Sequence, residues 1–68
     1  MELKMESYKD RATKEYNELK ERHGRLYLFF STRVFIEGVP KIERKLLRDQ
    51  YDVMTKYLEI LELRISLM

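Results

Sequence analysis

Apolar side chains recur at every seventh position through the first half of this chain, and this spacing constrains the fold more than any other feature of the sequence. Residues seven apart lie about two turns apart on the same face of an α-helix. One such row is apolar throughout: Met5, Ala12, Leu19 and Leu26. A second row is aromatic at both ends and charged in the middle: Tyr8, Glu15, Arg22 and Phe29. The spacing predicts a helix with charged residues on a face that should meet a partner.

The two charged residues of the second row, Glu15 and Arg22, are expensive to bury. A buried ion that is neither paired nor hydrogen-bonded costs several kcal/mol. The two residues are two turns apart, which is too far for an ion pair within one helix. They either satisfy each other across helices or face something polar, and we expect each to face another chain or a ligand.

Two helices account for the whole chain. Helical periodicity extends over about residues 3–30, and a turn of about residues 31–39 interrupts it before a second helix over about residues 40–67. A turn this short between two helices makes them antiparallel neighbours. We therefore predict an all-α fold, an antiparallel two-helix hairpin, with residues 1–68 forming a single domain.

The last residues of the turn mark where the second helix begins. Gly38 precedes Pro40, which stands where a first-turn proline belongs, and Glu43 follows in the opening turn. The β-branched and aromatic content of the turn would also permit a short strand around Arg33 to Ile36, but no second strand is available to pair with it.

The second helix carries more apolar surface than one hairpin can cover. One row consists of Leu47, Met54, Leu61 and Met68, flanked by Tyr51, Leu58 and Ile65. Another row, on a different face, consists of Leu46, Val53, Ile60 and Leu67. A helix that is apolar over most of its circumference is buried on more than one side. We expect one row to cover the first helix and the other to form a homo-oligomer interface, the alternative being ordinary surface hydrophobicity.

Composition narrows the classes of function. The chain has no cysteine and a single histidine, so we expect neither a disulfide nor a zinc site, and no cofactor. Catalysis is not expected, because His23 has no nucleophile at a suitable spacing and no glycine-rich phosphate loop is present. Lys plus Arg number 14 against 12 Asp plus Glu, and the charges are interspersed, so the chain has no general DNA or RNA footprint.

We expect no membrane association, because the longest uncharged apolar run, Leu26 to Phe30, falls far short of the ~20 residues of a membrane span. The amino-terminal residues also lack the apolar core of a signal peptide. These features predict a cytoplasmic protein.

One glycine interrupts the first helix, in the run Arg22-His23-Gly24-Arg25. A glycine within a helix costs up to about 1 kcal/mol relative to alanine, so it is either tolerated or allows a backbone or a ligand to approach closely. Several aromatic residues lie within about five turns of it: Tyr8, Tyr16, Tyr27, Phe29 and Phe30. Guanidinium groups bind phosphate and aromatic rings stack on bases, so the combination fits a nucleotide. The alternative is that the rings form the core and the arginines are solvated.

The pattern resembles the phage anti-CBASS sponge family, small helical hairpins related to the hairpin domain of the phage anti-Thoeris sponges. The resemblance extends over nearly the whole chain. Its first part consists of Tyr8-x-x-Arg11, Glu15, Leu19, Arg22, Leu26 and Phe29-Phe30-Ser31. Its second part consists of Phe35, Val39-Pro40, Glu43, Leu46-Leu47, Gln50, Met54, Tyr57 and Arg64-Ile65.

The resemblance implies a protein that binds cyclic oligonucleotide signals of the infected cell without cleaving them. The ligands it implies are cyclic dinucleotides, such as 3',3'-cyclic GMP-AMP, and cyclic trinucleotides at separate sites. It also implies a hexamer that holds dinucleotides between protomers. A ligand with two-fold or three-fold symmetry suits the corresponding axis of such an oligomer.

The resemblance also implies roles for individual residues. Tyr8 stacks on a base, and Arg11 supports it or contacts phosphate. Arg22 or His23 contacts phosphate oxygens, where the family leads us to expect a lysine-like residue at the position of His23. Arg25 and Arg64 are the candidates for a trinucleotide site.

Two other functions are compatible with the sequence. The chain could be an oligomeric hairpin that docks on a host protein through the apolar cluster from Leu26 to Phe30. A small nucleic-acid binder fits least well, because the charge is mixed.

Overall fold

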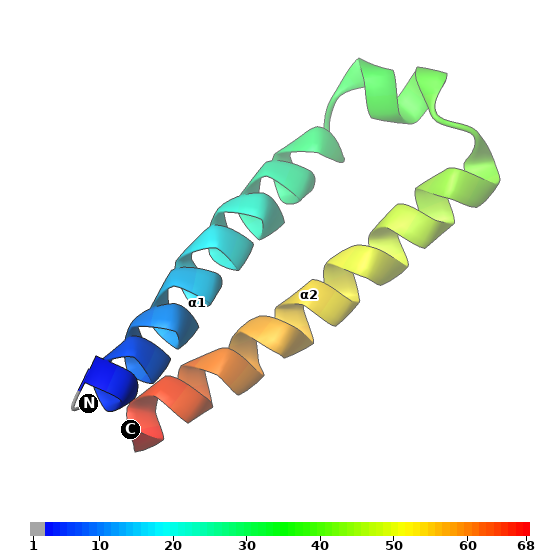
Figure 1. Ribbon diagram of the computed structural model, residues 1–68. Coiled ribbons are helices and arrows are strands. Elements are labelled where there is room, and N and C mark those ends of the chain that lie inside the picture. Colours follow the sequence, from blue (N-terminus) through cyan, green and yellow to red (C-terminus); the bar gives the residue numbers. More distant parts are fainter. Residues whose placement is uncertain (1–2) are drawn as a thin grey trace.

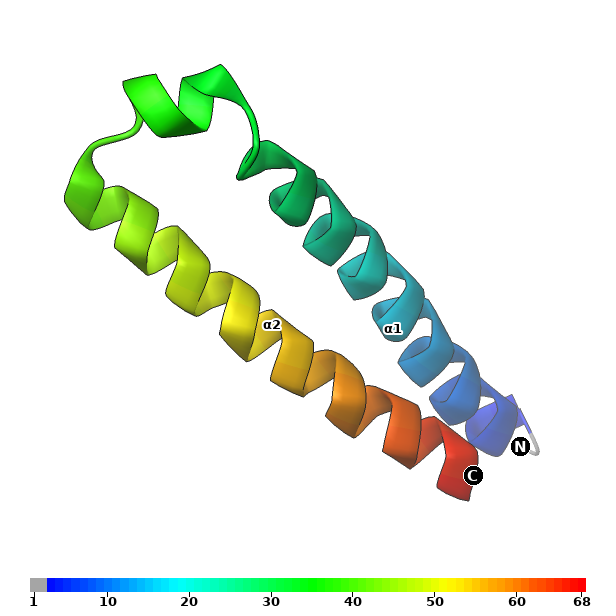
Figure 2. The same cartoon turned by 180° about the vertical axis from the view of Figure 1, so that it is seen from behind.

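The computed structural model describes residues 3–68, with side chains described from Tyr8 onward. Two helices of 27 residues each, α1 (Leu3–Phe29) and α2 (Lys41–Leu67), lie antiparallel with both chain ends at the same end of the molecule (Figures 1 and 2). The hairpin is elongated, with extents of 52 × 16 × 14 Å. The predicted all-α two-helix hairpin is confirmed. The side chain of Met5, the first residue of the apolar row, lies outside the described residues.

The connection between the helices is itself helical. A short π-helix, η1 (Val34–Gly38), crosses between the ends of α1 and α2 (Figure 1). The side chain of Thr32 accepts a hydrogen bond from the backbone N–H of Phe35 at 3.2 Å and donates one to the carbonyl of Phe29 at 2.7 Å. The strand considered for this segment is therefore absent from the described chain, because a lone strand has no backbone partner whereas a helical turn satisfies its own polar groups.

Phe35 fixes this connection to the rest of the hairpin. Its side chain is only 1% exposed, and it is the buried residue of η1. Its ring meets Phe29 at a centroid distance of 5.5 Å, edge to face, and Phe30 at 5.0 Å. Pairs of this geometry add to the free energy of apolar burial. The connection is thus a packed part of the structure.

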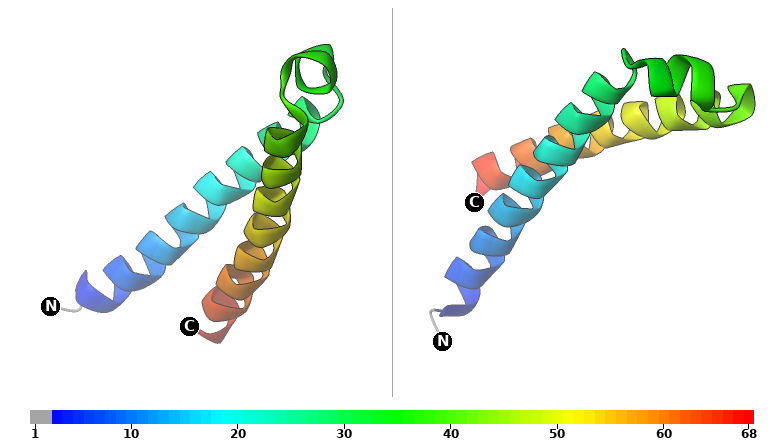
Figure 3. Two further views of the ribbon diagram at one scale, coloured as in Figure 1. Left: turned by 90° about the vertical axis from the view of Figure 1, so that its right-hand side faces the viewer. Right: turned by 90° about the horizontal axis from the view of Figure 1, so that it is seen from above.

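The buried core is a narrow seam between the helices. Among the described residues, the buried apolar side chains are Ala12, Leu19, Phe35 and Leu61. Leu61 belongs to the first of the two apolar rows predicted for the second helix and is 0% exposed, so this is the row that covers α1. The axes of the two antiparallel helices are inclined to each other: they diverge in the left view of Figure 3 and cross in the right view. Long-range packing is therefore concentrated in a few side chains.

The second apolar row of α2 contributes no buried side chain to this seam. Its members are exposed: Leu46 by 58%, Val53 by 67%, Ile60 by 45% and Leu67 by 86%. A continuous exposed row of this kind is a typical surface for protein contacts. In the part of the chain that the structure describes, no helix is both long enough and apolar enough to cross a membrane.

Truncation of Leu61 should remove a large part of the stability of the hairpin. Leu61→Ala deletes a fully buried side chain and should lower the free energy of unfolding by about 2–5 kcal/mol. Denaturant unfolding followed by circular dichroism, at one fixed protein concentration, measures this change. The control is Leu63→Ala, because Leu63 lies on the same helix and is 64% exposed; its loss should stay below about 1 kcal/mol. Equal losses in the two variants would contradict the assigned core.

Candidate functional site

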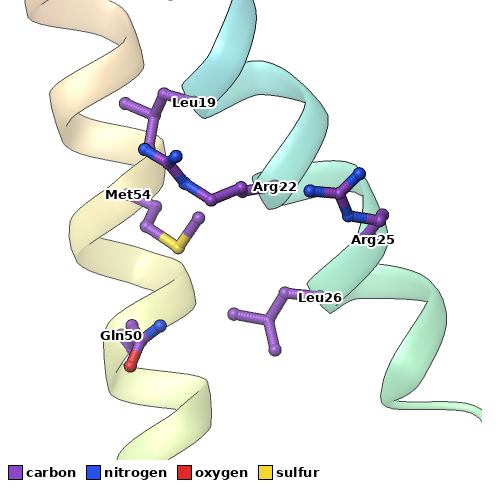
Figure 4. Close-up of a pocket in the computed structure, with 6 residues that line it drawn as sticks. All are labelled: Leu19, Arg22, Arg25, Leu26, Gln50 and Met54. Atoms are coloured by element: carbon purple, nitrogen blue, oxygen red, sulfur yellow. The ribbon is translucent and has the colours of Figure 1, made fainter. Parts of the chain in front are cut away.

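An open groove of about 480 Å³ lies between α1 and α2 near the middle of the hairpin. It is lined by Leu19, Arg22, Arg25, Leu26, Gln50 and Met54. In Figure 4 the side chain of Arg22 extends from α1 toward Leu19 and Met54, whereas that of Arg25 stays beside α1. The groove thus combines apolar walls with two guanidinium groups and one amide.

Helix geometry places these groups together. Arg22 and Arg25 are three residues apart, so their side chains leave neighbouring turns of the same face. Arg25 also contacts the carboxylate of Glu21 at 3.4 Å, and both of these side chains are about two-thirds exposed. Such an exposed pair contributes little to stability, so a competing anion can displace it. The two guanidinium groups can bind phosphate oxygens, and the Gln50 amide can donate to or accept from a base edge.

A second group of predicted site residues lies at the end of the hairpin that carries the termini. Arg64 donates a hydrogen bond of 3.0 Å from Nη2 to the hydroxyl of Tyr8, and its guanidinium carbon lies 5.8 Å from the centroid of the Tyr8 ring. The Tyr8 ring is half exposed, so one ring face can still receive a base. Arg11, which is exposed, follows Tyr8 by one helical turn. Residues brought together here are therefore Tyr8, Arg11 and Arg64.

The two groups are too far apart to serve one small ligand within one chain. Tyr8 and Arg22 are separated by 14 residues of continuous helix, which corresponds to about 21 Å along the axis. A ligand that touches both kinds of residue must therefore bridge two copies of the chain, with the end of one hairpin beside the groove of another.

His23 lies in a contact between the helices. Its Nε2 atom is 2.7 Å from Oγ1 of Thr55, and its ring stacks on Tyr51 with a centroid distance of 4.2 Å and an interplanar angle of 16°. Thr55 donates its own proton to the carbonyl of Tyr51 at 3.0 Å, so its oxygen accepts the hydrogen bond from His23. The histidine is half buried and faces α2, and it does not line the groove beside Arg22.

Glu15 has a partner that the sequence analysis missed. Its carboxylate accepts a hydrogen bond from the hydroxyl of Tyr57 on α2 of the same chain. The expectation that Glu15 faces another chain or a ligand is therefore wrong. The partner is a tyrosine hydroxyl on the facing helix, which can satisfy a carboxylate but which residue spacing within α1 does not reveal.

The structure excludes one reason for a glycine at position 24, a close approach by another part of the same chain. A Cβ atom added at Gly24 would meet nothing within 4 Å, so no backbone approach within the chain requires a glycine there. The remaining interpretations are a tolerated glycine and a close approach by a ligand or another copy. Gln50 and Met54 were present in the family pattern, but no residue pattern identified them as groove residues. Their place in the groove depends on which residues of α2 lie opposite Arg22, and the sequence does not show this alignment of the two helices.

The site has the composition of a binding site. Within residues covered by the structure, no group of three or more His, Cys, Asp or Glu side chains is arranged to hold a metal ion. The groove lining contains no hydroxyl, thiol, imidazole or carboxylate that could act as a nucleophile or general base.

Comparison with known proteins identifies one family. The Sequestin family model matches residues 6–67 of the chain. No curated protein and no solved structure matches it. The matched range includes the groove and the residues around Tyr8 and Arg64.

The hydrogen bond between His23 and Thr55 should contribute measurably to stability. Thr55→Val keeps the shape of the side chain but leaves the half-buried imidazole without its acceptor, so it should lower the free energy of unfolding by about 1–3 kcal/mol. Thr55→Ser retains the hydroxyl and should lose less than half of that amount. Thermal unfolding of the two variants at equal concentration measures the difference. If Thr55→Val and Thr55→Ser unfolded with the same free energy, the hydrogen bond would contribute nothing to stability.

Proposed function

This chain belongs to the Sequestin family, and we propose that it is a phage anti-defence sponge that sequesters cyclic di- and trinucleotide messengers of the host cell. The family name describes a sequestering protein, which denotes binding rather than catalysis. In this proposal the protein acts in the host cytoplasm and blocks CBASS immunity by lowering the free messenger concentration. The observation that carries the proposal is the pair of guanidinium groups, Arg22 and Arg25, in a groove whose other lining residues are apolar except for Gln50.

The chemistry of the groove suits a nucleotide. Leu19, Leu26 and Met54 offer apolar contacts to a base or ribose, while Arg22 and Arg25 offer paired N–H donors to phosphate oxygens. A sponge needs affinity and abundance, because it must compete with the receptor of the signal. Nanomolar dissociation, about 12 kcal/mol, is the scale required.

A ligand site between protomers is supported by two observations. The Tyr8 and Arg22 groups are about 21 Å apart in one chain, so a shared ligand requires residues from two copies. The exposed row of Leu46, Val53 and Ile60 supplies an apolar surface on which copies can associate. We propose a hexamer, in which two-fold related copies bind cyclic dinucleotides and three-fold related copies bind cyclic trinucleotides.

Individual roles follow within this proposal. Tyr8 stacks on a base and Arg11 supports it, while Arg22 contacts phosphate. His23 shares the role proposed for Arg22 only if its hydrogen bond to Thr55 is released, so Arg22 is the stronger candidate of the two. Arg25 and Arg64 contact the trinucleotide; Arg64 is held by Tyr8 in the free chain.

One observation favours the alternative of an interaction protein. Within the apolar cluster from Leu26 to Phe30, Tyr27 is 61% and Leu28 is 66% exposed, so an apolar anchor for a host protein is available. This alternative requires no nucleotide, and the absence of binding to every cyclic nucleotide would support it.

Calorimetric titration of the chain with 3',3'-cyclic GMP-AMP, a cyclic trinucleotide and a nucleotide with a pyrophosphate bridge tests the ligand. We expect nanomolar binding of the cyclic dinucleotide and a loss of at least about 100-fold, or 2.7 kcal/mol, in Arg22→Gln. The matched control is Arg33→Gln, because Arg33 lies outside the groove and its side chain is 89% exposed. Ligand recovered after denaturation should be intact, and recovery of a linear product would refute the sponge mechanism. Preference for the pyrophosphate-bridged nucleotide, lost in Arg22→Gln, would exclude cyclic dinucleotides as the main ligand of the groove.

A charge within the exposed row should separate the copies. Val53→Glu introduces a carboxylate into the proposed interface and should convert the oligomer into smaller species, because an unpaired buried charge is costly. Analytical ultracentrifugation measures the mass. Leu28→Glu is the control, since Leu28 is exposed to a similar degree but lies on α1, outside the row. A wild-type chain that remains monomeric at micromolar concentration would disprove the shared site.

A further inference from the structure

A cationic cluster near the start of α2 has no role in the proposed sponge site. Lys41, Arg44, Lys45 and Arg48 follow one another at helical spacing and line an open depression of about 460 Å³ together with Phe35 and Ile36. None of these residues lines the groove between the helices. The cluster lies at the end of the hairpin occupied by η1, opposite the chain termini (Figure 2).

Like charges at this spacing oppose folding. Lys41 and Lys45 are four residues apart, as are Arg44 and Arg48, and like-charged side chains at this separation repel one another on a helix. Cations near a helix N-terminus are also unfavourable for the helix dipole. Glu43 cannot relieve the repulsion on this face, because two residues past Lys41 place it on the opposite side of the helix.

Carboxylates neutralise only part of the cluster. Lys45 contacts Asp49 at 3.0 Å in an exposed ion pair. Among the residues that the structure describes, Lys41, Arg44 and Arg48 have no carboxylate in ion-pair contact. An excess of positive charge is therefore left around the depression, where an external anion can approach it.

The two arginines are held in place before any ligand arrives. Arg44 donates a hydrogen bond of 2.8 Å from Nη1 to the backbone carbonyl of Ile36. The guanidinium carbon of Arg48 lies 5.0 Å from the Phe30 ring centroid and 5.3 Å from that of Phe35. Each guanidinium keeps further N–H donors that these contacts do not use. Fixing them in advance reduces the entropy lost when a ligand binds.

We propose that this depression binds a small anion with two linked phosphate groups, of the kind found in inorganic pyrophosphate and nucleoside diphosphates. Lys41 and Arg48 are about 10 Å apart along the helix, so two linked phosphates, which are longer than one, can contact more of the four cationic side chains at once. The Phe35 ring is only 1% exposed and Arg48 covers it, so the depression offers no open aromatic face for base stacking. The site therefore recognises phosphates rather than bases.

A titration of the ¹⁵N-labelled chain with inorganic pyrophosphate, at ionic strength held constant with sodium chloride, tests the site by NMR. We expect saturable shifts at the Nε–H groups of Arg44 and Arg48 and at the amide of Ile36, with inorganic phosphate at least tenfold weaker. Shifts that do not saturate, or that sodium chloride alone reproduces, would overturn the proposal.

The variants separate binding from folding. Lys41→Gln with Lys45→Gln removes two exposed charges, so the fold should be retained by circular dichroism and the affinity for pyrophosphate should fall at least tenfold. Arg44→Gln should weaken binding to a similar extent. Arg33→Gln is the matched control, because Arg33 lies at the same end of the hairpin, pairs with Glu37 and is outside the depression. Unchanged affinity in the lysine double variant would overturn the site.

Two further experiments test whether the depression binds a larger partner that carries phosphate groups. The wild-type chain is mixed with phosphatidylglycerol vesicles and, separately, with a short single-stranded RNA. We expect neither to compete with pyrophosphate at equal phosphate concentration. Retention on either one without pyrophosphate binding would replace the proposed small anion with that macromolecule.

Discussion

The narrow seam between two antiparallel helices is the constraint on which the rest of the structure depends. A chain of 68 residues has little apolar surface to bury, and in the described part only a few side chains, such as Phe35 and Leu61, are fully buried. Chains of this size commonly gain stability through association. The same shortage of core explains why apolar residues such as Val53 remain on the surface and why a groove stays open between the helices.

The sequence was sufficient to predict the hairpin because both helices have strong apolar periodicity and because Pro40 marks the start of the second. It was insufficient for the connection. The residues of η1 have strand-like side chains, and the packing of Phe35 against Phe29 and Phe30, together with the hydrogen bonds of Thr32, favours a helical turn. Tertiary contacts decide such short segments, and a periodicity argument does not contain them.

The candidate site was predictable in its residue types but only partly in its arrangement. Helical spacing brings Arg22 and Arg25 to one face, and the structure adds Gln50 and Met54 from the facing helix. His23 is adjacent in sequence to Arg22 but leaves the helix at a different angle, which directs it to Thr55. Glu15 was assigned an external partner, whereas Tyr57 satisfies it internally. Pairings between helices depend on the register of the hairpin, and one sequence does not reveal that register.

The register itself has a consequence for ligand capture. Polar contacts join the helices on both sides of Arg22 along α1: Glu15 with Tyr57 before it, and His23 with Thr55 after it. Sliding one helix along the other would break both contacts at once. The spacing of the groove walls is therefore set before any ligand arrives, so little binding energy is lost to rearrangement, and a site that only holds its ligand requires no moving part.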